Sequence, residues 1–156
     1  MTTVVRTSQV LVKSSLQKAF DYVSDLTRHP EWSGGELKIE ATTPGPIAVG
    51  KEYYSRGQVA VQKDRPNTVQ ITEYEAPRKF AFAARDPDFG RVTHEFTFTE
   101  QNGGVLITRI MTVNLNLFVA FAFRFFIYPL IGRPSMNRAM AGLKTKLEGN
   151  AEVPAD

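Results

Sequence analysis

Two polar side chains alternate in phase with large apolar residues, in segments that have the pattern of β-strands. His94 is in phase with Phe96, and Arg109 is in phase with Met111. Successive side chains of a strand point to opposite faces of a sheet, so a core that buries Phe96 and Met111 should also receive His94 and Arg109. Histidine can act as a general acid or base, and arginine can stabilise an oxyanion.

Glu73 and Tyr53 follow the same rule in two other segments. Glu73 is in phase with Ile71, and Tyr53 is in phase with Val59. We expect Glu73 to form an ion pair with Arg109, with the role of general base as the alternative. Tyr53 is expected to donate to a ligand carbonyl or to line a wall. A β-bulge in either strand would reverse the set of inward residues.

The composition argues against several other kinds of site. The chain has no cysteine and only two histidines, His29 and His94, so no metal centre is expected. Gly-rich phosphate loops, HExxH and GxSxG are absent, and no cofactor is predicted. The net charge of +3 comes from basic residues spread along the chain, whereas nucleic-acid binding needs a clustered basic face. We therefore expect no nucleic-acid partner.

The elements that position these residues begin with a long strand over residues 3–15, which is rich in β-branched residues. Ser14 or Ser15 then caps a short amphipathic helix that runs to about Asp25. The stretch LTRHPEWSGG ends that helix, because a residue before proline disfavours helical geometry. Trp32, the single tryptophan, is expected at the mouth of the core, as a cap or as a ligand gate.

Six further strands, separated by turns, fill the middle of the chain. The pattern predicts them over residues 36–43, 51–64, 68–75, 79–86, 91–100 and 105–114, with RPN as the turn after the second of them. The short connections, above all QNGG, favour an antiparallel meander. Bulges are expected at Gly57 or Gly90, the places where a strand carries a glycine.

The last predicted element is a helix over residues 136–149, with Met136, Met140, Leu143 and Leu147 on one face. A strongly curved antiparallel sheet cannot fill its own concave side and needs a helix laid across it. The expected fold is therefore α+β. About six to seven antiparallel strands wrap around a long C-terminal helix, with a short helical region after the first strand.

Residues 117–132, LFVAFAFRFFIYPLIG, are almost entirely apolar. A membrane-spanning helix needs about 20 mainly apolar residues, and the central Arg124 opposes a span. Pro129, Gly132 and Pro134 are expected to interrupt the helix. Three interpretations stay open. The segment is the buried start of the C-terminal helix, the roof and gate of an apolar cavity, or an exposed cluster for a dimer or a membrane.

Four segments, AFDYVSDLTRHPEWSGG, ITEYEAPRKFAF, HEFTFTEQNGGVLITRIM and LKTKLEG, make the chain similar to a known group of proteins. Together they resemble the START-like, helix-grip (SRPBCC) superfamily, and within it the polyketide cyclase/dehydrase and lipid-transport branch. The resemblance implies a deep cavity between the sheet and the long helix. We expect one START-like domain over residues 1–148 and a flexible tail over residues 149–156.

The resemblance also implies binding of a small hydrophobic ligand in that cavity, such as a lipid, a polyketide or another apolar metabolite. The candidate ligand-binding residues are Trp32, Tyr53, Val59, Ile71, Phe82, His94, Phe96, Arg109, Met111, Phe118, Phe121 and Phe125. One alternative is a metal-free cyclase or dehydratase that uses His94, Glu73 and Arg109 as acid, base and oxyanion stabiliser. Another is a membrane-docking or oligomeric accessory protein that uses the Phe-rich helix. We expect a cytoplasmic monomer or homodimer, compatible with peripheral membrane contact but without a membrane span.

Overall fold

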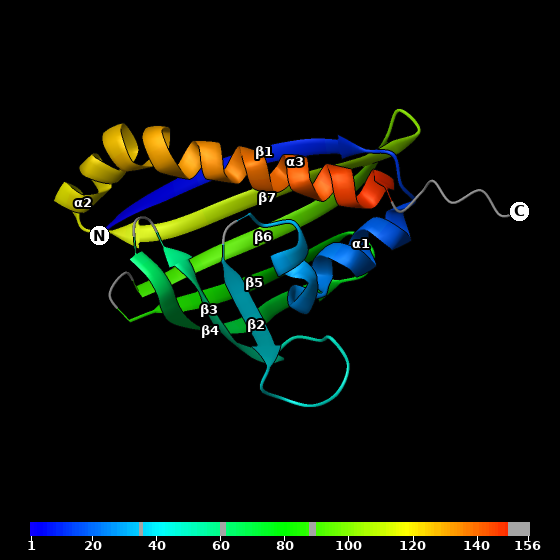
Figure 1. Ribbon diagram of the computed structural model, residues 1–156, viewed down its shortest axis with the longest axis horizontal. Coiled ribbons are helices and arrows are strands. Elements are labelled where there is room, and N and C mark those ends of the chain that lie inside the picture. Colours follow the sequence, from blue (N-terminus) through cyan, green and yellow to red (C-terminus); the bar gives the residue numbers. More distant parts are fainter. Residues whose placement is uncertain (35, 60–61, 88–89, 150–156) are drawn as a thin grey trace, which may run out of the picture.

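The computed structural model describes residues 1–34, 36–59, 62–87 and 90–149, with Val59 described by its backbone only. Its elements, labelled in Figure 1, are β1 (Thr2–Val12), α1 (Leu16–Ser24), η1 (Leu26–Glu31), β2 (Leu37–Ala41), β3 (Glu52–Val59), β4 (Gln62–Glu75), β5 (Lys79–Asp86), β6 (Gly90–Gln101), β7 (Gly104–Leu115), α2 (Leu117–Ala122), η2 (Phe123–Gly132) and α3 (Arg133–Gly149). The predicted tail lies outside the described residues, except for Gly149, which ends α3.

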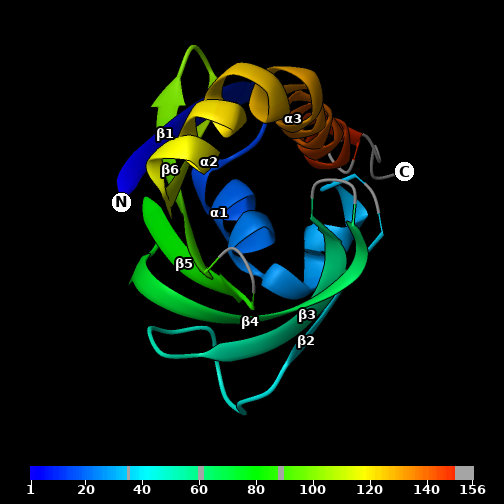
Figure 2. The ribbon, with the colours of Figure 1, turned by 90° about the vertical axis from the view of Figure 1, so that its left-hand side faces the viewer.

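The seven strands form one antiparallel sheet in the order β1-β7-β6-β5-β4-β3-β2. The chain meanders from β2 to β7, and β1 adds itself beside β7. Figure 2 shows the sheet curling around α1 and η1, with α3 lying across the opening. The predicted α+β, helix-grip fold is confirmed, with seven strands.

Local sequence sets the ends of several elements. The Ser15 hydroxyl accepts a hydrogen bond from the Lys18 N–H at 3.3 Å and caps α1. Between β6 and β7, Asn102 and Gly103 have φ values of 50° and 74°, as expected for the tight hairpin that QNGG predicts. The β6–β7 register is consequently fixed from the turn onward.

The second predicted middle strand proves to be two strands. β3 ends at Val59 and β4 begins at Gln62. The RPN triplet, predicted as a turn, lies inside β4, where Pro66 pairs with Arg56. Because pairing of β4 with β5 begins only at Thr68, Pro66 has a neighbouring strand on one side only. A proline without an N–H is tolerated at such a position.

A β-bulge between Ile71 and Glu73 changes the alternation of β4. The sequence interpretation does not place a bulge there. A second register shift lies between Gly57 and Val59, one of the two glycine positions where a bulge is predicted. The β5–β6 pairing is regular through Gly90. The inward side chains of β6 therefore follow the predicted alternation, whereas those at the end of β4 do not.

The apolar core consists of two separate clusters. The larger one lies between α1, α3 and the sheet, and at its centre the rings of Phe80 and Phe96 stack with centroids 5.0 Å apart. The smaller one, beside α2, consists of Val4, Val113, Leu115 and Ala120. On β1, β6 and β7 the two clusters are separated by residues that belong to neither.

The two edge strands, β1 and β2, are joined by helical segments. α3 packs along β1, and η1 packs against β2. α3 approaches the residue after η1 at Gly142, where an added Cβ would lie 2.8 Å from the carbonyl oxygen of Trp32. Glycine permits this approach because it has no Cβ. The gap between the two edges of the sheet is therefore bridged where α3 contacts Trp32, the residue after η1.

The helix from α2 to α3 is continuous, so the predicted interruption by prolines is wrong. Its middle part, η2, is π-helical, and the Arg133 N–H donates to the carbonyl oxygen of Tyr128, five residues earlier. Gly132 leaves room for the Tyr128 ring, since an added Cβ would lie 2.8 Å from its Cδ2. The π-helical stretch thus accommodates Pro129 and holds Tyr128 close to the helix.

Candidate functional site

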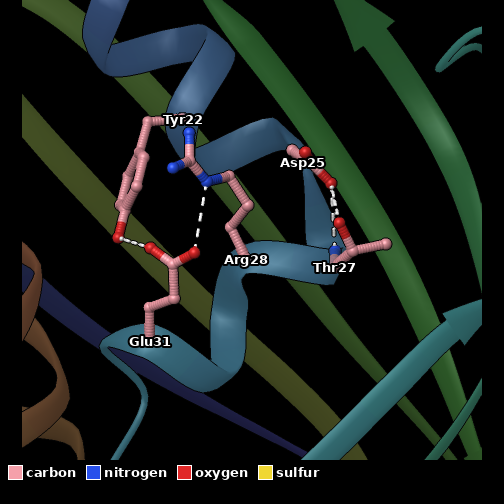
Figure 3. A network of polar contacts seen from close by, with 5 residues as sticks. All are labelled: Tyr22, Asp25, Thr27, Arg28 and Glu31. Carbon is pink, nitrogen blue, oxygen red and sulfur yellow. Dashed lines mark hydrogen bonds and ion pairs between the residues drawn. The ribbon is translucent and has the colours of Figure 1, made fainter.

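A network of polar contacts holds η1 at its junction with α1, as Figure 3 shows. The Tyr22 hydroxyl donates to Oε2 of Glu31 at 2.7 Å, and Arg28 Nε donates to Oε1 at 3.3 Å. The Asp25 carboxylate accepts from the N–H and the hydroxyl of Thr27 at 3.1 and 2.6 Å. Burial and the hydrogen bond to Glu31 raise the pKa of Tyr22, which keeps it a donor. These contacts fix the turn that carries the next residues inward.

η1 and the residue after it place His29 and Trp32 in the interior. Both side chains are buried, with ring centroids 4.6 Å apart. His29 Nε2 lies 2.7 Å from the carbonyl oxygen of Val23, so this nitrogen carries the proton and donates it. Burial lowers the pKa of His29 to about 4, and the charge of Arg109 acts in the same direction. His29 is therefore neutral at neutral pH.

The structure brings His94 and Arg109 together on the concave face of the sheet. Arg109 Nη2 lies 3.3 Å from Nδ1 of His94. Guanidinium nitrogens only donate, so Nδ1 accepts and the imidazole proton is on Nε2. Burial lowers the pKa of Arg109 to about 10. Burial, Arg109 and His29 hold the pKa of His94 well below its usual value.

We call the residues between the two apolar clusters the central layer: Arg6, Ser8, His94, Arg109 and Met111. Strand register places them side by side, because Ser8 pairs with Arg109, and Met111 pairs with both Arg6 and His94. All five are in phase with buried residues of their strands, yet each stays partly exposed to solvent. The concave face is therefore not sealed at this level.

Tyr128 of η2 lies over the central layer. The Arg6 guanidinium carbon is 4.7 Å from the centre of the Tyr128 ring, and the Tyr128 hydroxyl is 3.7 Å from Sδ of Met136. Tyr128 also acts electrostatically on Arg109, where it opposes the fall in pKa that burial causes. The Phe-rich helix thus contributes one tyrosine to the roof of the candidate site.

Several polar atoms in this interior have no hydrogen-bond partner among the described residues. They are Ser8 Oγ, Trp32 Nε1, Tyr53 Oη and Arg109 Nε. Burial raises the pKa of Tyr53 to about 12, so its hydroxyl keeps its proton. Buried polar groups are nearly always hydrogen-bonded in proteins. These donors are therefore candidates for contacts with polar atoms of a ligand.

Glu73 does not join this group, so its predicted ion pair with Arg109 is wrong. The bulge in β4 turns Tyr74 inward, where its ring lies 5.3 Å from that of Phe20. Glu73 instead pairs with Lys79, whose Nζ lies 3.0 Å from the carboxylate. The predicted set of acid, base and oxyanion stabiliser is therefore not assembled.

The remaining predicted ligand-binding residues divide into two sets. Those on the concave side are Trp32, Tyr53, Ile71, Phe82, Phe96 and Met111. Those on the outside are Phe118, Phe121 and Phe125, which are 81%, 57% and 55% exposed. The three phenylalanines thus point away from the central layer, contrary to the roof-and-gate expectation. The side chain of Val59 lies outside the described residues.

Sequence reasoning missed four members of the site, namely Arg6, Ser8, His29 and Tyr128. It considers His29 as one of two histidines too few for a metal centre and as part of a helix break before Pro30, and neither consideration says anything about burial. Arg6 and Ser8 are in phase with Val4 and so could have been found by the alternation rule that selects His94. The pairing of the first strand with the last, which the sequence does not reveal, brings them beside Arg109.

Two surface hollows formed by described residues lie apart from the central layer. One is lined by Tyr54, Pro66, Asn67, Thr68, Arg85, Asp86 and Pro87. The other is lined by Ser15, Gln17, Lys18, Asp21, Tyr22, Arg28 and Leu147. Neither includes a residue of the central layer, so the candidate site is defined by the interruption of the core.

A curled antiparallel sheet gripping a long helix, with polar groups set among apolar residues on the concave side, defines a helix-grip protein. The chain belongs to the polyketide cyclase / dehydrase and lipid transport family, whose model matches residues 1–148. The family predicted from the sequence is thus confirmed. No curated protein sequence matches the chain at a significant level.

Solved structures share the fold at low sequence identity. TTHA0849 from Thermus thermophilus is 13% identical, with a TM-score of 0.73, covering 96% of this chain and 100% of that one. The di-domain ARO/CYC BexL from the BE-7585A biosynthetic pathway is 14% identical, with a TM-score of 0.72, covering 98% of this chain and 51% of that one. Ara h 8.0201 is 11% identical, with a TM-score of 0.69, covering 94% and 98%.

Proposed function

We propose that the protein binds a small hydrophobic ligand against the central layer, between the sheet and the helix formed by η2 and α3. The observation that carries this proposal is the interruption of the core by five inward-facing side chains that keep partial exposure. Protein interiors are close-packed, so a partly exposed layer between two apolar clusters offers contacts that the chain does not fill. The family description, which includes lipid transport, supports the proposal.

The surroundings of the central layer suit an apolar molecule with a few polar atoms. Phe82 and Phe96 present their rings next to His94 and Arg109, at 5.0 Å and 5.6 Å. Tyr53 and the other unpartnered donors supply a small number of polar contacts. Ligand sites commonly combine a mainly apolar lining with a few placed polar groups. A cytoplasmic location for this binding remains part of the proposal.

We favour binding over catalysis because the predicted acid–base set is incomplete. A general base must lie within hydrogen-bond reach of the proton that it takes, and Glu73 is engaged by Lys79. BexL is an ARO/CYC, but at 14% identity its likeness to this chain concerns the fold. We therefore propose a binding protein without assigning a reaction to it.

Fluorescence of the uncharged dye N-phenyl-1-naphthylamine tests the proposal, since the dye brightens in apolar surroundings. The wild type should bind it, and Met111→Trp should weaken binding at least about tenfold by filling the central layer. Thr112→Trp is the matched control, because Thr112 is the next residue of β7 and points to the opposite face. Absence of binding by the wild type, or equal binding by Met111→Trp, contradicts the proposal.

A second candidate function is peripheral docking on an anionic membrane. The surface that favours it, here called the Phe face, consists of Leu117, Phe118, Phe121, Phe125, Phe126, Leu130 and Ile131, all exposed. Exposed Arg124, Arg133 and Arg138 lie in the same helix, and residues 116–147 contain no aspartate or glutamate. A basic surface repels a second copy of itself and attracts anionic lipid.

The same helix, Leu117–Gly149, is long and apolar enough to cross a membrane by length and composition alone. Its C-terminal half contributes Met136, Met140, Leu143 and Leu147 to the buried side of the domain. A helix that gives one face to a protein core lies on a membrane rather than through it. We therefore propose surface contact, not a span.

A further inference from the structure

We infer that the ligand of the central layer carries a carboxylate, held by Arg109. This inference rests on the proposed function and names the class of ligand. It starts from a charged side chain that lies inside the protein without an opposite charge beside it. Arg109 comes from the middle of β7, and it points to the concave face of the sheet.

Arg109 has few partners for its hydrogen-bond donors. Its contacts with described residues are the 3.3 Å approach of Nη2 to His94 and the 5.6 Å approach of Cζ to the Phe96 ring. Nε is buried without a partner, and the ion pairs found among the described residues all involve other side chains. A guanidinium has five N–H donors in a planar fork. Most of them are thus available to an acceptor.

The charges around Arg109 favour an anion over a cation. The inward faces of the three nearest strands carry Arg6, His94 and Arg109, and the one acid in phase with them, Glu100, is exposed near the hairpin end of β6, opposite Val105. His29 lies close enough for Arg109 to affect its pKa. Asp25 acts electrostatically on His29 and on Tyr53, but no acid is among the groups that act on Arg109. A buried charge without a counterion is costly, and a bound anion would remove that cost.

A carboxylate fits the donors that Arg109 leaves open, and its single charge matches one guanidinium better than the nearly double charge of a phosphate monoester does. A carboxylate matches the planar fork of arginine in a bidentate contact. His94 accepts through Nδ1 from Arg109 and so orients the guanidinium, while its own Nε2–H points away from that contact. The adjoining Phe82, Phe96 and Met111 are apolar. The fitting ligand is therefore an apolar chain or ring system that ends in one carboxylate.

Competition between two matched ligands tests this inference. Decanoic acid and decan-1-ol share a chain and differ in the end group, and each is titrated against protein loaded with N-phenyl-1-naphthylamine at pH 7. We expect the acid to displace the dye at roughly ten- to a hundredfold lower concentration than the alcohol, as a charge-assisted hydrogen-bond pair implies. In Arg109→Gln the acid-to-alcohol ratio should fall to about one, while Arg91→Gln, which removes an exposed arginine of β6, keeps the wild-type ratio.

The possible outcomes separate this inference from the proposed function. Dye binding with equal displacement by acid and alcohol overturns the carboxylate and leaves the proposed function standing. An acid preference that persists in folded Arg109→Gln overturns the role of Arg109. Failure of the wild type to bind the dye contradicts both proposals. The acid-to-alcohol ratio is measured within one protein, so a change in dye affinity cancels. If Arg109→Gln does not fold, the ratio of the wild type alone decides the ligand class.

Discussion

The imidazole of His29 ties the stability of the protein to pH. Burial lowers its pKa from an ordinary 6.5 to about 4 in the folded state, and the Val23 carbonyl, Arg109 and Asp25 also act on this pKa. His94, which it influences in turn, is shifted in the same direction. Below pH 6.5 the imidazole of His29 binds a proton in the unfolded chain, whereas in the folded protein it stays neutral until the pH approaches 4. The contribution of His29 to stability is therefore fully present above pH 6.5 and is lost as the pH falls towards 4.

We expect His29 alone to lower the free energy of unfolding by about 2 kcal/mol between pH 7 and pH 5. Urea unfolding of the wild type and His29→Gln at both pH values measures it. Glutamine keeps an N–H for the Val23 carbonyl but does not titrate, so its loss of stability should be smaller by that amount. An identical loss in both proteins would show that the pH dependence arises elsewhere.

The alternation of apolar residues predicts single side chains only where strand pairing is regular. It places His94 and Arg109 correctly on the concave face, because β6 and β7 pair without a shift from their hairpin to Val92. It assigns Glu73 to the wrong face of the sheet, because no glycine in the sequence indicates the bulge after Ile71. The absence of a carboxylate beside Arg109 among the described residues, which suggests the ligand class, could therefore not have been predicted.

The contact between α3 and the end of η1 is a sensitive point of the fold. In Gly142→Ala the new Cβ would meet the Trp32 carbonyl oxygen at 2.8 Å, so one of the two segments must move. We expect the free energy of unfolding to fall by about 1–2 kcal/mol, since overpacking outweighs the better helix propensity of alanine. Thermal unfolding measures it. Gly149→Ala, also in α3 but with open space around its Cβ position, should be neutral, and equal melting temperatures of the two variants would contradict this view.

Element types follow from the sequence more reliably than element ends. Apolar periodicity predicts β5 with its observed ends and the faces of α3, because those segments are long and regular. The end of β3 and the start of β4 are misplaced, since Pro66 resembles a turn residue yet lies inside β4 beside a single neighbouring strand. The π-helical form of η2 likewise depends on hydrogen bonding that no residue pattern indicates.

For the protein as a whole, the Phe face predicts binding to anionic vesicles. We expect flotation with phosphatidylglycerol vesicles but not with phosphatidylcholine vesicles, and weaker flotation at high salt. Phe118→Ser combined with Phe126→Ser should reduce it strongly, because both side chains are more than half exposed. Val49→Ser, which changes an exposed apolar residue elsewhere, is the control. Equal flotation of both variants would reject the Phe face as the docking surface.

The closure between β1 and β2 has a consequence for which molecules can be accommodated. A β-barrel that is fully closed by backbone hydrogen bonds has a circumference set by its number of strands and their stagger. Here the last gap is bridged by the contact of α3 with Trp32, the residue after η1. Van der Waals contacts allow small displacements without loss of backbone hydrogen bonds between strands. The distance between β1 and β2 can therefore change at this contact. Ligands of different sizes can then bind to the same fold, with the rest of the sheet unchanged.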